Sequence, residues 1–145
     1  MFKIKTEEER ENFAIISIEP LEAGFGHTLG NGLRRVLLAS LPGAAITSVK
    51  IDGVAHQFST IEGVLEDVIE IILNIKKIRL SVHSDKPIKL SLKASGKKVV
   101  KAKDLEIEGD GDIANPDQHI ATLTDSKSKL NIEMEVARGR GYVPA

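Results

Sequence analysis

Three glycines near the N-terminus have a spacing that could bind a dinucleotide. Gly26, Gly30 and Gly32 form the pattern G-x-x-x-G-x-G within the stretch GFGHTLGNGLRR. In one class of nucleotide-binding loops, such glycines make a tight turn after a buried parallel strand. The pyrophosphate of NAD or NADP then lies at the N-terminus of the following helix. The spacing therefore raises the hypothesis of a nucleotide-binding enzyme.

The residues around these glycines favour a different interpretation. The preceding segment, AIISIEP, lacks the continuous apolar run of a strand buried on both faces, and the polar EPLEAG separates it from the glycines. Gly24 and Gly26 would instead shape the turn before a helix, with Gly30 and Gly32 in its first turns. Because glycine inside a helix costs about 1 kcal/mol relative to alanine, this pair predicts a close neighbouring backbone.

No other residue pattern predicts catalysis, a cofactor or a metal ion. The chain has no cysteine, and its four histidines are isolated in the sequence, without metal-ligand spacing. Glu66, Asp67, Glu70 and Asn74 are close enough together to suggest paired carboxylates for acid–base chemistry. Since no nucleophile or base accompanies them in the sequence, we interpret them as the solvated face of a helix.

Composition excludes several classes of protein. The 145 residues carry a net charge of −1 and are 41% hydrophobic, which is enough for a globular core. There is neither a basic block nor a set of aromatic stacking residues, so we expect no direct contact with nucleic acid. The longest apolar stretch, VIEIILNI, is much shorter than a membrane span, and no secretory signal precedes the first strand.

Alternation of apolar and polar residues predicts an α+β protein dominated by antiparallel strands. In the segment 130–136, Leu130, Ile132, Met134 and Val136 should face a core, while the intervening Asn and Glu face water. The predicted strands are 13–20, 46–52, 78–82, 88–92 and 130–136, with shorter ones around 99–107 and 119–124. Turn-forming stretches, including SDKP, ASGKK and EGDGD, separate them.

Two segments have helical periodicity. In 27–41, Leu29, Leu33, Val36 and Leu37 share one face, and Pro42 with Gly43 should end the helix. The second helix is predicted over about 60–77. Ser59 and Glu62 should form a capping box at its start. Its apolar stripe is wide, which predicts that the helix is covered on more than one side; the stripe comprises Ile61, Val64, Leu65, Val68, Ile69, Ile71, Ile72, Leu73 and Ile75.

The opposite face of the first helix carries Arg34, Arg35 and Leu38. Such a face is either solvated or binds a protein, since an apolar residue beside arginines is typical of interface hot spots. The pattern alone leaves both interpretations open. A third, that the chain binds partners through open sheet edges, also remains.

The longer sequence context carries a resemblance to a known family. The stretch IEPLEAGFGHTLGNGLRRVLLASLPGAAITSVKIDGVAHQFSTIEGVLEDVIEIILNIKKIRL resembles the N-terminal domain of the α subunit of bacterial or plastid RNA polymerase. The similarity continues through IANPDQHIATLT to VARGRGYVPA, so it extends from about residue 13 to the end. Gly32 departs from the alanine more usual in this motif of the family.

The resemblance implies a non-catalytic subunit of a nucleotidyltransferase, the DNA-directed RNA polymerase. Such α subunits dimerise and provide the platform for assembly of the β and β′ subunits during transcription. Residues 1–42 would be the first half of a mixed helix and sheet dimerisation part, and 43–145 an inserted β-rich domain with one helix. Family members continue beyond GYVPA, so we expect a fragment of a cytoplasmic, nucleoid-associated protein or of its counterpart in a plastid stroma.

The resemblance also assigns roles to individual residues. The second arginine of the LRR motif, Arg35, would contact the β subunit. By the same resemblance, Arg34, Leu38, His56 and Ser59 would lie in regions that join this contact. The first helix would pack in the interface with a second α subunit, through Leu29, Gly30, Gly32, Leu33 and Leu37.

Overall fold

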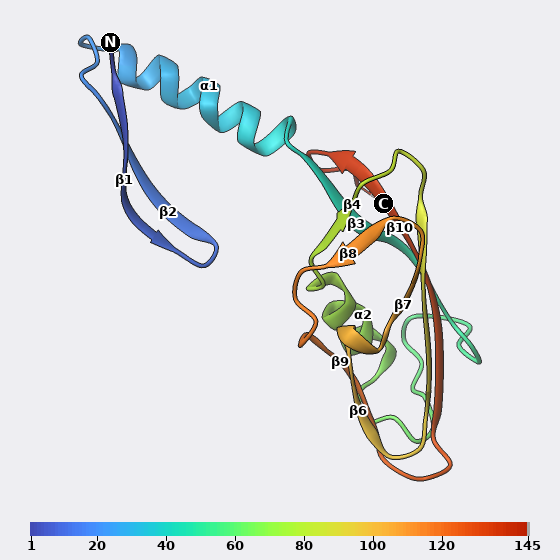
Figure 1. Ribbon diagram of the computed structural model, residues 1–145. Coiled ribbons are helices and arrows are strands. Elements are labelled where there is room, and N and C mark those ends of the chain that lie inside the picture. The colour runs from blue at the N-terminus through green and yellow to red at the C-terminus, as the bar shows by residue number, and fades with distance from the viewer. Residues whose placement is uncertain (145) are drawn as a thin grey trace. The chain divides into compact units, whose positions relative to one another are not determined.

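The computed structural model describes residues 1–144, which form two compact units (Figure 1). The first unit comprises Met1–Leu41 together with the residues from Gly141 onward, and the second comprises Pro42–Arg140. Each unit contains an α-helix and antiparallel strands, and the second carries the hydrophobic core, which confirms the predicted α+β class.

The first unit contains a β-hairpin and a helix. Strand β1 (Lys3–Arg10) pairs antiparallel with β2 (Phe13–Glu19), and Asn12 adopts a positive φ of 61° in the turn between them. β1 was not predicted, because KIKTEEER is mostly charged and lacks a clear apolar alternation. All eight of its side chains are exposed, so its strand form rests on backbone pairing with β2 and not on burial.

Helix α1 (Phe25–Ala39) begins two residues earlier than predicted and ends two residues before the predicted Leu41, with Ser40 as its C-cap. Gly24 precedes it with a positive φ of 83°, as predicted for a turn, but Gly26 lies inside the helix, so the prediction that it also shapes the turn was wrong. Pro42 and Gly43 lie at the start of the next strand and not in the helix. No residue of α1 is buried, and the face formed by Leu29, Leu33, Val36 and Leu37 is not part of the hydrophobic core cluster of this chain.

The second unit is built on a six-stranded antiparallel sheet with the strand order β7-β5-β10-β3-β4-β8. A separate two-stranded sheet pairs β6 with β9. The bounds are β3 (Pro42–Ile51), α2 (Val68–Lys76), β4 (Leu80–Val82), β5 (Ile88–Ser95), β6 (Lys98–Lys101), the short 3₁₀ helix η1 (Ala102–Asp104), β7 (Glu106–Glu108), β8 (Gly111–Ile113), β9 (His119–Leu123) and β10 (Lys129–Arg140).

The hydrophobic core lies on one face of the large sheet. Leu130, Ile132, Met134 and Val136 of β10 are each at most 2% exposed, and the polar residues between them are exposed, so the predicted alternation is confirmed. Apolar side chains from α2, β6 and β9 belong to the same core cluster. Burial of each such side chain contributes about 1.5–3 kcal/mol, which makes this cluster the main source of stability in the second unit.

Helix α2 is shorter than predicted, and its predicted capping box was wrong. It begins at Val68, and Asp67 is the N-cap, with Oδ1 accepting from the Glu70 backbone N–H at 2.8 Å. Upstream, Gly63 has a positive φ of 78°, and Leu65 N–H donates to Thr122 O at 2.9 Å. Residues 64–66 therefore contact β9 in place of continuing the helix.

One side of α2 carries its buried residues. Val68, Ile71 and Ile75 are buried, whereas Ile69 is 38% and Leu73 is 52% exposed. The prediction that the helix is covered on more than one side was therefore wrong for this chain.

The remaining strand predictions were confirmed with two changes. The segment 99–107 divides into parts of β6, η1 and β7. β8 lies partly in EGDGD, which was predicted as a turn. Gly111 allows this strand to lie close to the core, because a Cβ there would come within 2.6 Å of Cδ1 of Ile88.

Candidate protein interface

The arginine face of α1 is open in this chain. Arg34, Arg35 and Leu38 are all exposed, and the Leu38 side chain is 68% exposed. Among residues 1–144, no carboxylate forms an ion pair with either guanidinium. An exposed leucine flanked by arginines with unused hydrogen-bond donors has the composition of a protein-binding hot spot.

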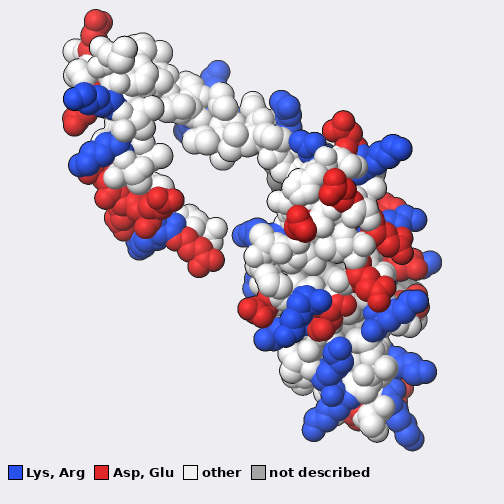
Figure 2. Space-filling model, viewed as in Figure 1, with Lys and Arg blue, Asp and Glu red and all other residues white. Residues whose placement is uncertain are grey.

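The leucine face of α1 is also open. Leu29 is half-buried, while Leu33, Val36 and Leu37 are between 43% and 60% exposed. In Figure 2 the surface of α1 is largely uncharged along its length. A Cβ built on Gly30 or Gly32 would meet no atom within 4 Å, so the close neighbour predicted for these glycines is not part of this chain. A contact with another chain remains the prediction for this face.

The dinucleotide hypothesis is not supported by the position of its glycines. Gly26, Gly30 and Gly32 all lie inside α1, so they form no phosphate-binding turn before a helix. The strand that precedes α1 belongs to an antiparallel hairpin, whereas a dinucleotide fold requires a parallel sheet.

The two predicted partner-binding residues of the second unit lie together in an exposed loop between β3 and α2. We call residues 52–60 the recognition loop. Ser59 Oγ lies 3.3 Å from Nδ1 of His56, and the Ser59 backbone N–H donates to His56 O at 3.2 Å. Sequence reasoning missed Phe58, which is 73% exposed between them. The only signal for it was an aromatic residue within a polar stretch of a protein with few aromatics.

A short segment after the recognition loop is fixed to the β9–β10 region through one carbonyl. The Gly63 carbonyl oxygen accepts from Thr124 N–H at 2.9 Å, Thr124 Oγ1 at 3.1 Å and Ser128 Oγ at 2.8 Å. Ser128 is buried, and its Oγ also accepts from Asp125 N–H at 3.2 Å. We call the segment 61–67 the strap.

Glu66 adds a second fixation point to the strap. One carboxylate oxygen accepts from Nε2 of His119 at 2.6 Å and from Thr122 Oγ1 at 3.0 Å, and the other accepts from Thr122 N–H at 2.6 Å. The Glu66 side chain is only 12% exposed. Partial burial would raise the pKa of its carboxyl, but the hydrogen bonds from His119, Thr122 and its own backbone N–H hold the pKa below its ordinary value.

The prediction that Glu66, Asp67, Glu70 and Asn74 form a solvated face was therefore wrong for Glu66 and Asn74, which are half-buried, whereas Asp67 and Glu70 are exposed. Glu66 binds β9, Asp67 caps α2, and Asn74 Nδ2 donates to Ile120 O at 3.1 Å. Sequence spacing could not reveal His119 as the partner of Glu66, because 53 residues separate them. Both carboxylate oxygens accept hydrogen bonds, so this group fixes the strap to β9.

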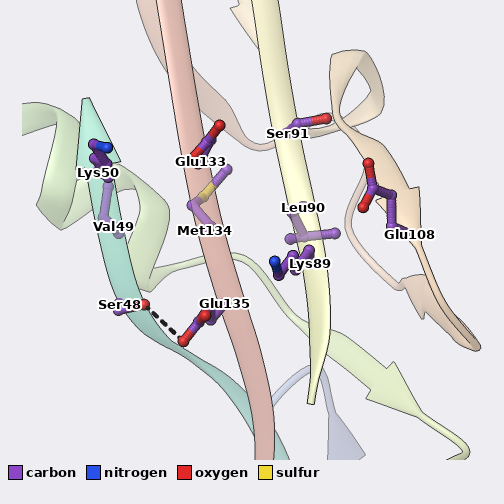
Figure 3. Close-up of a pocket in the computed structure, with 10 residues that line it drawn as sticks. All are labelled: Ser48, Val49, Lys50, Lys89, Leu90, Ser91, Glu108, Glu133, Met134 and Glu135. Carbon is purple, nitrogen blue, oxygen red and sulfur yellow. Dashed lines mark hydrogen bonds between the residues drawn. The ribbon is translucent and has the colours of Figure 1, made fainter. Parts of the chain in front are cut away.

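A hollow of about 410 Å³ lies on the solvent face of the large sheet (Figure 3). Its lining comes from β3, β5, β7 and β10 and alternates charges, for example Lys50 beside Glu133 and Lys89 beside Glu135. Glu135 accepts from Ser48 Oγ at 3.3 Å. Because these charged side chains alternate on exposed positions of neighbouring strands, the hollow is the polar outer surface of the sheet.

Among the described residues 1–144, no three His, Asp or Glu side chains are placed to hold a metal ion. In the same part of the chain, neither helix is long and apolar enough to cross a membrane.

Known proteins resemble this chain over its whole length. It is 52% identical over 145 residues to the DNA-directed RNA polymerase subunit alpha of Roseiflexus sp. (strain RS-1) and 56% identical over 137 residues to that of Symbiobacterium thermophilum. The chain is 62% identical over 128 residues to the same subunit of Corynebacterium efficiens. The chain covers 45%, 43% and 38% of these three relatives, which is less than half the length of each.

The family model described as the RNA polymerase Rpb3/RpoA insert domain matches residues 49–145. This match begins within β3 and includes the recognition loop, the strap and the core of the second unit. The resemblance predicted from sequence is therefore confirmed. The chain belongs to the RNA polymerase Rpb3/RpoA insert domain family.

Proposed function

We propose that this chain is part of a non-catalytic RNA polymerase α subunit, which serves as an assembly platform in transcription. The observation that carries this proposal is α1, a helix with an apolar face and an arginine face that are both open in the chain. Such a helix can bind two partners at once. The relatives named as RNA polymerase α subunits support the same function.

The leucine face is proposed to bind a second copy of the subunit. Leu29, Leu33 and Leu37 would pack against their counterparts, and Gly30 and Gly32 would allow the two helix backbones to approach closely. The open space around both glycines supports this role, because a bulky neighbour within the chain would have excluded it. The separation of Met1–Leu41 from Pro42–Arg140 supports the proposed division into a dimerisation part, 1–42, and an inserted domain, 43–145.

The arginine face and the recognition loop are proposed to bind the large β subunit. Arg35 would pair bidentately with carboxylates or carbonyls of that subunit. Arg34, Leu38, His56 and Ser59 would complete the contact. The exposure of Arg34, Arg35 and Leu38 supports this assignment, as does the hydrogen bonding that holds His56 beside Ser59. The same assembly would bring in the β′ subunit, in the cytoplasm.

Titration of the chain with purified β subunit tests this proposal. Arg35→Ala should weaken binding by about 1–3 kcal/mol, as expected for a hot-spot arginine, and should leave the melting temperature unchanged because the side chain is exposed. Arg79→Ala removes an exposed arginine that follows α2 and is the matched control. Equal affinity of Arg35→Ala and Arg79→Ala would contradict the role of Arg35, and no binding by the parent chain would contradict the platform function.

A further inference from the structure

The recognition loop is exposed, but it is tied to the folded core at both ends. At its start, Asp52 N–H donates to Asn131 O at 3.1 Å and Val54 N–H donates to Ile51 O at 3.3 Å. At its end, the Ser59 carbonyl accepts from Val68 N–H at 3.1 Å, which is the first N–H of α2. The half-buried Val54 also packs against the core. Residues 55–58 thus project from a fixed base.

The strap holds the end of this loop through contacts that do not involve the loop's exposed side chains. Three donors bind Gly63 O, and three donors from His119 and Thr122 bind the Glu66 carboxylate. A bridge between Val64 and Leu123 lies between these two points. This is more side-chain hydrogen bonding than a connecting loop needs, and it is concentrated where the loop meets the core.

We propose that Gly63, Glu66 and Ser128 are positioning residues that hold the recognition loop, with Phe58 as its exposed apolar contact, in the conformation that the β subunit binds. This inference rests on the proposed function. The physical reason is preorganisation, since a loop that is ordered before binding loses less conformational entropy when the partner binds. Gly63 is required because a side chain at its positive φ would collide with Ser128.

A purely structural role for the strap predicts a different outcome from a positioning role. If the strap only stabilises the fold, Glu66→Gln should lower global stability, so that the loop amides accelerate no more than the core amides of β5 and β10, and the affinity for the β subunit should stay the same. If the strap positions the loop, the loop should open locally at a lower free energy than the whole domain does. Amide hydrogen exchange distinguishes the two without any partner.

The experiment compares hydrogen exchange and β-subunit affinity in Glu66→Gln and in Glu106→Gln, the control for removal of an exposed carboxylate on β7. In Glu66→Gln, the amides of Ser59 and Val68 should exchange about tenfold faster or more, and this acceleration should exceed that of the β5 and β10 amides, which follows the change in global stability. Affinity should fall about tenfold. His119→Ala removes one of the three donors and should give a smaller change in the same direction, which provides a second test if Glu66→Gln folds poorly.

A double-mutant cycle separates positioning from contact. Phe58→Ala should weaken binding without changing amide exchange, and its effect should shrink in the Glu66→Gln background, because a mobile loop no longer presents the ring. Unchanged loop exchange in Glu66→Gln overturns the inference, as does faster exchange with unchanged affinity. If binding depends on Arg35 but ignores both Glu66 and Phe58, only this inference fails. If the parent chain does not bind the β subunit at all, the proposed function fails.

Discussion

The carboxylate of Glu66 lies 2.6 Å from Nε2 of His119, although 53 residues separate the two in sequence. Glu66 precedes α2, and His119 begins β9. With Thr122, His119 joins the segment before the helix to the small β6–β9 sheet. At the point where the strap leaves β9 and leads into α2, hydrogen bonds to this carboxylate therefore take the place of backbone pairing with β9.

Substitution of Glu66 should destabilise the second unit measurably. Glu66→Gln keeps the size of the side chain but removes a charged acceptor from a site that is 12% exposed. We expect a loss of about 1–3 kcal/mol in the free energy of unfolding, measured by urea denaturation at pH 7. Glu106→Gln, on the exposed β7, should change this free energy by less than about 0.5 kcal/mol. Equal effects would show that the Glu66 hydrogen bonds contribute no net stability.

The same carboxylate should give the stability a defined pH dependence. Because hydrogen bonds lower its pKa in the folded state below the ordinary value of 4.5, the unfolded chain binds its proton first as the pH falls. Its contribution is therefore complete above about pH 4.5 and is lost as the pH falls through the folded-state pKa. Unfolding free energies measured from pH 7 to pH 3 should fall less steeply in Glu66→Gln than in the parent. Identical slopes would contradict the assignment.

Gly63 and Gly96 make a matched pair for testing the strap. Their φ angles are 78° and 77°, but a Cβ at Gly63 would collide with Ser128, whereas a Cβ at Gly96 would meet nothing within 4 Å. Gly96→Ala should cost about 1 kcal/mol from backbone strain alone. Gly63→Ala should cost about 1–3 kcal/mol more because of the collision. Thermal or urea unfolding checks the difference, and equal costs would show that Ser128 moves aside freely.

The leucine face of α1 should control self-association. Leu37→Glu places a charge where the parent side chain is 60% exposed, so it should leave folding of the second unit intact and abolish dimers. Leu73→Glu introduces the same charge at a 52% exposed position on α2 and should leave association unchanged. Sedimentation velocity of both variants checks the expectation. A parent chain that stays monomeric at high concentration would count against dimerisation through α1 in this chain.

Local sequence patterns correctly predicted those strands and helices in which the spacing of apolar residues alone determines which face is apolar. The alternation of Leu130, Ile132, Met134 and Val136 predicted both a strand and its buried face, because one side chain in two must face the core of such a sheet. The order of leucines and arginines around α1 predicted two chemically different faces, since helix geometry alone places them. Both predictions depend only on neighbours within a few residues.

Patterns were misleading where a distant segment competed with local preference. Ser59, Glu62 and the apolar residues after them fit a helix, but hydrogen bonds from Thr122, Thr124 and Ser128 hold 61–66 beside β9. Likewise, the residues around Glu66 are typical of a solvated helix face. Hydrogen bonds from His119 and Thr122 hold its carboxylate in the fold. No periodicity contains this information, because those donors come from a different part of the chain.

The amino-acid sequence by itself determined the α+β class, the strand faces, the two faces of α1 and the family, because these follow from local periodicity or from residue identity. Only the tertiary structure decided where α2 begins, how the strap fixes the recognition loop, and that Phe58 is exposed beside His56. The physical reason is that a backbone carbonyl such as that of Gly63 binds whichever donors folding brings to it.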